Sequence, residues 1–427
     1  MSTHDDSTQD AHRVSAWRLV WMMCLAQTLV QIGAFFWPAL LPQLAPQWAL
    51  SNSAAGWITA AFYGAYMLAV PVLVTLTDRV DPKRIYLFGV GLTVAGHLLF
   101  GLCADGFWPA LACRALTGIG WAGTYMTGLK LLADRVDARM MSRATAGHAA
   151  SIGLSGALSF ATGDWLARLA GWQTAFFAAS LSAAVAWIMI ALVVPRQQKA
   201  APKPVDGAAL YDFRPVLRNR SAMAYATAYA IHTLEMSALR GWGVAFLAYV
   251  ASSTGTTATV LSPAVLLTAL GLIGTAASIL GNEAAIAYGR RRLVQTAMLG
   301  SVILGGVIGF LGTHSYPLAA SLILFYGLVI WLDSSSLTAG AAGTAEPSRR
   351  GATLAVHSTL GYAGGFIGPL LIGWTLDWSG GMSQSGWGLS FACVSGLMLI
   401  ALGVFWWIDP RELAGDRGAP PRTSRTG

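Results

Sequence analysis

The chain has 427 residues, of which 55% are hydrophobic and 11% are charged, whereas roughly 25% are charged in an average soluble domain. So few charges cannot build a water-facing exterior, so the composition excludes an ordinary soluble protein and predicts an all-α membrane protein. The formal net charge of +8 would suit a nucleic-acid-binding protein, but the distribution of the basic residues indicates a membrane protein instead.

Apolar runs of about 20 residues, the length that crosses a bilayer, recur along the chain. They group into two predicted six-helix halves, 18–195 and 221–409. Residues 1–17 are polar and acidic and predict a tail rather than a signal peptide. A Pro- and Lys-containing stretch at 196–220 predicts a linker, and 410–427 a second tail. The predicted spans are 18–44, 53–76, 85–103, 107–129, 144–167, 172–194, 221–250, 261–283, 293–313, 316–341, 352–376 and 386–408.

The basic residues predict the orientation of these spans. All but three of the 27 Lys and Arg residues fall in segments that twelve spans leave on one side, together with both termini; the exceptions are Arg114, Arg168 and Arg240. The positive-inside rule identifies that side as the cytoplasm of the plasma (inner) membrane. The expected partners are therefore membrane lipid, a small-molecule substrate and protons, but not nucleic acid. We expect the chain to act as a monomer.

The sequence gives no sign of enzyme chemistry. It contains no evident nucleophile–base pair and no metal-ligand spacing. The HTLE run at 232–235 lacks the second histidine of a metalloprotease helix. We therefore predict a protein that is not an enzyme, with no catalytic residue, metal site or cofactor.

Three short patterns occur in both halves and in the same order within each helix set. They are Ala144-Thr145 with Gly153 and Gly156, matched by Ala352-Thr353 with Gly361 and Gly364; Gly171-Trp172, matched by Gly386-Trp387; and Pro82-Lys83-Arg84, matched by Arg290-Arg291-Arg292. Because each half has an even number of spans, the halves are predicted to be parallel repeats about an axis along the membrane normal.

Over residues 18–408 these features resemble the major facilitator superfamily. The signature loop of that family between helices 2 and 3 reads here Asp78-Arg79-Val80-Asp81-Pro82-Lys83-Arg84, without its glycine. The copy after helix 8 keeps Gly289 and three arginines but has Ile286-Ala287 in place of Asp-Arg, with Glu283 as the candidate substitute. The helix 4 signature appears as Arg114 followed by Gly118 and Gly120.

The resemblance implies two pseudo-symmetric six-helix bundles and transport by alternating access, with helices 1, 4, 7 and 10 lining a central cavity. It also implies a conformational latch formed by Asp78, Arg79, Lys83 and Arg84; the alternative is a basic loop that only sets the orientation of the chain in the membrane. The Gly-Pro motif of proton-driven drug antiporters is absent from helix 5, where Gly153 and Gly156 stand. That absence weighs against multidrug efflux.

Polar residues inside the predicted spans are concentrated on those four helices. A charged side chain at the bilayer centre costs at least about 2.5–3.5 kcal/mol, so each one requires a partner, a wet cavity or a function. The deep polar residues are Gln27 and Gln31 on helix 1, Arg114 on helix 4, His232, Glu235 and Arg240 on helix 7, and Asp333 on helix 10.

We predict that the substrate site comprises Arg114, Arg240, Gln27, Gln31, Trp121 and Trp331. His232 and Glu235, three residues apart on one helix face, are predicted to exchange a proton together with Asp333. Structural alternatives remain open: interhelical hydrogen bonds for the glutamines, packing for the tryptophans, a carboxylate partner for Arg114, and pairing of Arg240 with the helix 7 acid or with Asp333. His148 and His357 are expected to be structural.

The two buried arginines favour a small organic or inorganic anion as the solute, carried with protons, with import slightly favoured over export. One alternative is proton-driven efflux of a hydrophobic or cationic compound that binds Glu235 and Asp333. Another is a non-transporting membrane receptor or scaffold that keeps the fold. Retention of the charges inside the spans argues against that last alternative.

Overall fold

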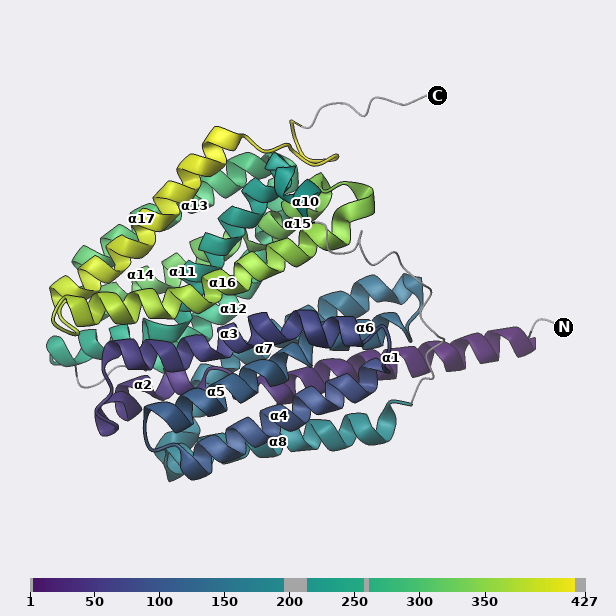
Figure 1. Cartoon of the computed structure of the whole chain (residues 1–427), viewed down its shortest axis with the longest axis horizontal. Helices are drawn as coiled ribbons and strands as arrows, with labels where there is room; N and C mark the ends of the chain where they lie inside the picture. Colours follow the sequence, from purple (N-terminus) through teal and green to yellow (C-terminus); the bar gives the residue numbers. More distant parts are fainter. Residues whose placement is uncertain (1–2, 196–212, 257–260, 419–427) are drawn as a thin grey trace. The chain divides into compact units, whose positions relative to one another are not determined.

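A computed structural model describes residues 3–195, 213–256 and 261–418, and all regular elements in these ranges are helices (Figure 1). Most of the predicted linker (196–212) and the end of the second predicted tail (419–427) lie outside the described residues. The first helix begins at Thr3, within the predicted first tail. Of the second predicted tail, residues 410–418 are described.

The first eight helices correspond to the first six predicted spans, because two of the spans are interrupted. They are α1 Thr3–Gln31, α2 Phe36–Gln47, α3 Asn52–Leu76, α4 Pro82–Cys103, α5 Phe107–Ala122, α6 Tyr125–Ala133, α7 Ala138–Ala170 and α8 Trp172–Val193.

The remaining helices correspond to the last six predicted spans, preceded by one short helix. They are α10 Arg214–Arg218, α11 Arg220–Ser253, α12 Pro263–Tyr288, α13 Arg290–Leu311, η1 Gly312–His314, α14 Tyr316–Leu332, α15 Ser334–Thr344, η2 Pro347–Arg349, α16 Arg350–Trp378 and α17 Gln384–Ile408.

Within the described residues, nine stretches are long and apolar enough to cross a membrane. Three predicted spans fall short of this criterion. The fourth is divided into α5 and α6, while α7 and α11 carry many polar residues. The all-α membrane fold is confirmed, and the helices are consistent with the predicted twelve spans.

The chain divides into two compact units. Unit 1 comprises residues 1–40 and 64–203, and unit 2 comprises 41–63 and 204–427. The predicted halves differ from these units at residues 41–63, which pack in unit 2. The carboxylate of Asp377 in α16 explains part of this grouping: it accepts hydrogen bonds from the backbone N–H groups of Asn52 (3.0 Å) and Ser53 (2.7 Å). A carboxylate at a helix N-terminus satisfies N–H groups that have no partner within the helix.

In unit 1, α4 packs against α5 and α8, and α1 packs against α7 and α8. The core between these helices includes the fully buried Met23, Tyr86 and Leu131. In unit 2, α11 runs along α16, α13 along α17, and α12 along α14 (Figure 1). Side chains added at Gly364 and Gly368 would overlap backbone oxygens of α11, so small residues allow α11 and α16 to approach closely.

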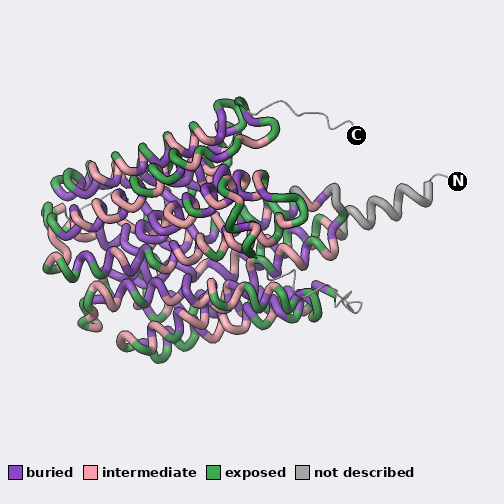
Figure 2. Tube along the Cα trace, turned by 45° about the horizontal axis from the view of Figure 1, so that its top comes forward, coloured by how far each residue is buried: buried purple, intermediate pink, exposed green. Residues whose placement is uncertain are grey.

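Many large apolar side chains lie on the surface, as the mixture of exposed and intermediate positions along the helices in Figure 2 illustrates. Leu68 is 73% exposed, Leu192 80% and Trp378 83%. Exposed apolar area on this scale is unfavourable in water and favourable in contact with acyl chains. The exposed apolar surface therefore agrees with the membrane location that the composition predicts.

Candidate functional site

Three predicted spans are interrupted near their middle. The breaks lie at residues 32–35 between α1 and α2, at Gly123 and Thr124 between α5 and α6, and at Asp333 between α14 and α15. A break releases backbone N–H and C=O groups, which require other partners inside a membrane. The predicted site residues Arg114 and Asp333 both lie at or beside such a break.

Arg114 supports the break in the first span. Its Nη1 donates a hydrogen bond to the carbonyl oxygen of Ala34 at 2.9 Å, and the side chain is 1% exposed. On the other side of the break, the N–H of Phe35 donates to the Oγ of Ser159 at 2.9 Å. Arg114 thus has a structural contact within unit 1, while its predicted role as a substrate ligand stays a prediction.

The other predicted unit 1 site residues are buried among neighbouring helices. Gln27 is fully buried, and its Oε1 accepts a hydrogen bond from the hydroxyl of Tyr86 in α4 at 3.3 Å. Gln31 is 5% exposed. The ring of Trp121 lies 4.6 Å from that of Tyr66, centroid to centroid. These contacts match the structural alternatives for the glutamines and Trp121, and no contact tests the substrate role.

In unit 2 the structure brings His232 and Asp333 together. His232 Nδ1 lies 3.1 Å from Asp333 Oδ1, and both side chains are less than 5% exposed. The two atoms are close enough for an ion pair but are not aligned for a hydrogen bond. The structure thus brings two ionisable side chains together away from solvent.

Glu235 has different partners from His232, although the two residues lie on one face of α11. Its Oε1 accepts hydrogen bonds from the hydroxyls of Tyr326 (2.5 Å) and Ser301. Its Oε2 has no hydrogen-bond partner among the described residues. Glu235 also lines a hollow of about 20 Å³ with Trp242, Phe246, Trp387 and Phe391, which is the size of about one water site.

Tyr229 lies between the two histidines of this region, His232 and His357. Tyr229 stacks on His232 with a centroid distance of 5.7 Å and on His357 at 4.0 Å. His357 Nε2 lies 3.2 Å from the Oγ1 of Thr338, a contact in keeping with the structural role expected for it. In unit 1, His148 Nε2 lies 3.1 Å from the carbonyl oxygen of Tyr125.

Arg240 and Trp331 also come together in unit 2. The guanidinium carbon of Arg240 lies 4.9 Å from the centre of the Trp331 ring, which is a cation–π contact. The partner observed for Asp333 is His232, whereas Arg240 lies over an aromatic ring. Unit 2 thus contains Arg240, the His232–Asp333 pair and the buried Glu235 on α11 and its neighbours.

The residues of the predicted latch have unequal environments. Lys83 is 6% exposed, and its Nζ donates to the carbonyl oxygens of Ala191 (2.8 Å) and Val194 at the end of α8. Asp78, Arg79 and Arg84 are exposed. The latch role stays a prediction.

Asp81 is the acid of this loop that the sequence did not single out. It accepts a hydrogen bond from the N–H of Lys83 at the start of α4 and pairs with Arg135 at 3.0 Å. Its place directly before Pro82, a favoured first helical residue, was the available signal.

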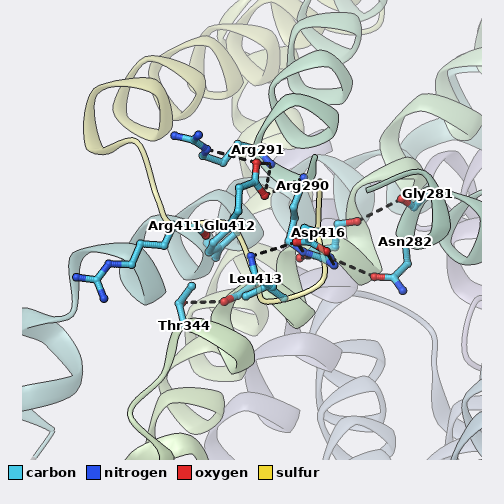
Figure 3. Close-up of polar contacts among 12 residues, drawn as sticks. Gly281, Asn282, Arg290, Arg291, Thr344, Arg411, Glu412, Leu413 and Asp416 are labelled. Atoms are coloured by element: carbon cyan, nitrogen blue, oxygen red, sulfur yellow. Dashed lines mark hydrogen bonds and ion pairs between the residues drawn. The ribbon is translucent and has the colours of Figure 1, made fainter. Parts of the chain in front are cut away.

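In unit 2, residues 409–418, which we call the C-terminal strap, supply the acids that the second signature loop lacks (Figure 3). Arg290 donates to both oxygens of Asp416, at 2.8 and 3.0 Å. Glu412 accepts from the backbone N–H groups of Arg290 and Arg291 at the start of α13. Glu283, the substitute considered from sequence, is exposed. The sequence signal for this role was the presence of three acids, at 409, 412 and 416, in an otherwise basic tail.

No group of three or more His, Cys, Asp or Glu side chains positioned for a metal ion occurs among the residues that the structure describes.

The family model described as Major Facilitator Superfamily matches residues 23–242. The MFS-type transporter YbcL of Bacillus subtilis (strain 168) is 22% identical over 353 residues, covering 81% of this chain and 85% of YbcL. The sphingosine-1-phosphate transporter SPNS2 of Xenopus tropicalis is 23% identical over 350 residues, covering 77% of this chain and 67% of SPNS2.

Among solved structures, a bacterial homolog of the human lysosomal transporter spinster, in an inward-facing and occupied conformation, superposes with a TM-score of 0.75. The two are 15% identical, and the match covers 92% of this chain and 96% of the other. These similarities agree with the all-helical fold described above. The chain therefore belongs to the major facilitator superfamily and is a multi-pass membrane transporter.

Proposed function

We propose that this transporter carries a small organic anion by alternating access, coupled to the movement of protons. The observation that carries the proposal is the buried group in unit 2, where the His232–Asp333 pair and Glu235 lie on helices that also carry Arg240. Ionisable side chains are costly inside a membrane, and they are retained where solvent and cargo reach them.

Arg240 is the proposed anion ligand. A guanidinium that lies over an indole ring has its N–H donors directed outward in its own plane, which is the orientation that binds a carboxylate or phosphate with two hydrogen bonds. The aromatic side chains lining the hollow beside Glu235 favour a solute with an apolar part. The name of SPNS2, a transporter of a phosphorylated lipid-like molecule, supports the same class of solute.

His232, Asp333 and Glu235 are the proposed proton carriers. Loss of one proton converts the His232–Asp333 pair from neutral to negative, and a buried negative charge is unfavourable unless a cation or a water-filled cavity compensates it. The charge of this pair therefore depends on which side of the membrane supplies its proton. This dependence would link protonation to the conformational equilibrium.

The test is uptake of labelled organic anions into proteoliposomes with an imposed pH gradient. We expect Asp333→Asn to lower pH-driven accumulation at least tenfold. The rate of anion exchange measured without a pH gradient should stay unchanged. We expect Arg240→Gln to raise the half-saturating anion concentration at least tenfold, and Arg240→Lys to raise it less. The exposed Glu346→Gln is the matched control. The coupling proposal fails if Asp333→Asn and His232→Gln both keep full pH-driven accumulation.

A second candidate is efflux of a hydrophobic cation, which the aromatic side chains around Glu235 favour. The same liposomes distinguish the two. If lipophilic cations are transported and depend on Glu235 but not on Arg240, the anion proposal is replaced by this one.

A further inference from the structure

The C-terminal strap does more than supply acids to the second signature loop. It joins the ends of several unit 2 helices (Figure 3). The N–H of Arg411 donates to the Oγ of Ser221 (3.2 Å), the hydroxyl of Tyr225 donates to the carbonyl oxygen of Arg411 (3.1 Å), and the N–H of Arg417 donates to the carbonyl oxygen of Ile286 (3.0 Å). The strap therefore has a defined conformation against α11 and α12, and its side chains have fixed positions.

The strap covers the corner of unit 2 where α12 ends and α13 begins. Its ion pairs involve two of the arginines at this corner. Arg290 is 2% exposed and binds Asp416, Asn282 and the carbonyl oxygen of Ser336. Arg291 pairs with Asp409 and Glu412. Glu412 in turn is held by the N–H groups of the first turn of α13. The acids of the corner are thus neutralised by groups of the protein itself.

Two further arginines lie at the same corner without an ion pair to another described residue. Arg292 is in the first turn of α13, and Arg417 is near the end of the strap; both are exposed. Together with Arg291, Gln295 and Trp406 they line a hollow of about 510 Å³. This volume lies within the range of small-molecule sites, roughly 300–1,000 Å³. Three arginines and two already paired carboxylates give the hollow a net positive lining.

The position of the hollow indicates which anion it fits. It lies where α12 ends, α13 begins and α17 ends, which are the ends of three membrane spans. The two aromatic residues that line it are strongly exposed: Tyr288 by 66% and Trp406 by 73%. Exposed Trp and Tyr at span ends mark the level of lipid headgroups. Basic pockets at this level bind phosphate-bearing headgroups.

We propose that this hollow binds the headgroup of an anionic phospholipid, with Arg292 and Arg417 as the phosphate ligands and Trp406 beside the upper acyl chains. The planar guanidinium groups suit the phosphate oxygens, to which they can each donate two hydrogen bonds. The negative charge of a bound phosphate group would offset one of the two positive charges of Arg292 and Arg417, and the bound headgroup would connect the strap to α13 and to the bilayer.

The experiment is thermal unfolding and native mass spectrometry of the full chain in detergent, with phosphatidylglycerol, phosphatidylcholine or inorganic phosphate added. We expect phosphatidylglycerol to raise the unfolding temperature and to stay bound in the mass spectrum, and phosphatidylcholine to do so much less. The double variant Arg292→Gln, Arg417→Gln should bind phosphatidylglycerol at least tenfold more weakly. The charge-retaining double variant Arg292→Lys, Arg417→Lys should keep most of the binding.

Arg84→Gln is the matched control, because Arg84 is the exposed counterpart of Arg292 in the repeated loop and does not line the hollow. An equal loss of lipid binding in Arg84→Gln would overturn the site in favour of general surface attraction. Unchanged phosphatidylglycerol binding in the glutamine double variant would overturn it as well. An equal temperature rise with inorganic phosphate would replace the lipid by a free anion. These readouts do not involve transport, so they are independent of the proposed function.

Discussion

The two signature loops solve the same structural problem with acids from different parts of the chain. After α3, Asp81 caps α4 and pairs with Arg135, so the acid is local. After α12, the equivalent position is Gly289, and the acids that cap α13 and pair with Arg290 come from the strap. The cations also differ. Lys83 binds carbonyl oxygens at the end of α8, whereas Arg291 binds carboxylates that follow α17.

The difference shows that the two halves form the same kinds of contact at this loop but use partners from different parts of the chain. In both units a cation at the start of the third span is bound to the end of the sixth. In both, a carboxylate caps the third span's first turn, where it satisfies N–H groups and interacts favourably with the helix dipole. A sequence comparison finds the cations because they stay in register. It misses the acids, because one is local and the others are more than a hundred residues away.

The largest loss of stability is expected from breaking the buried ion pair between Arg290 and Asp416 in unit 2. Both side chains of Arg290 and Asp416 are 3% exposed, so Asp416→Asn would leave a buried guanidinium without its counter-charge. We expect a loss of about 3–5 kcal/mol in the free energy of unfolding, measured by chemical denaturation in detergent. Glu283→Gln is the control and should change nothing measurable. A similar loss in both variants would mean that Glu283 contributes as much as the strap to neutralising the arginine.

A smaller loss of stability is expected from Asp81→Asn in unit 1. Arg135 also donates to the carbonyl oxygens of Pro195 (3.2 Å) and Leu131 (3.4 Å), so Asp81→Asn leaves it partly satisfied, and asparagine remains a good helix cap. We expect a loss of about 1–2 kcal/mol, measured in the same way. A loss as large as that of Asp416→Asn would show that the two corners are energetically equivalent.

The smallest effect is expected from Glu412→Gln. Glutamine keeps an acceptor for the α13 N–H groups but removes the negative charge from the helix N-terminus and from Arg291. The interaction of a charge with a helix terminus is worth about 0.5–1 kcal/mol, and we expect a loss of that size. No loss at all would mean that the charge of Glu412 contributes nothing to holding the strap.

The fold followed from the sequence because long apolar runs and the placement of basic residues are strong signals. Each predicted span corresponds to a helix or to two consecutive helices, with ends that mostly differ by a few residues; the exception is α1, which begins at Thr3 instead of residue 18. The breaks within spans were not predicted, because small and polar residues such as Gly123, Thr124 and the serines after Asp333 also occur in continuous membrane helices. At residues 32–35 and at Asp333 the break has a side-chain partner on another helix, and spacing along one chain does not report such contacts.

The candidate site was predictable as a set of residues but not as a set of contacts. Helical spacing groups His232 with Glu235, since residues three apart share a face. In the structure each reaches a different neighbour, Asp333 for His232 and Ser301 with Tyr326 for Glu235. Likewise a lone arginine such as Arg114 suggests a charged ligand, whereas its acceptor here is a carbonyl oxygen at the break between α1 and α2. Backbone acceptors leave no trace in side-chain patterns.

The strap also has a consequence for biogenesis. In unit 1 the contacts of Asp81 and Lys83 described above can form once residue 195 has been synthesised. In unit 2, Asp416 follows Arg290 by 126 residues, which takes roughly 6–25 s at ribosomal rates of about 5–20 residues per second. During that interval the arginine is already at the membrane while its counter-charge has not been made. The second half must therefore begin to insert before the Arg290–Asp416 ion pair can form, and this pair forms only after the strap has been translated.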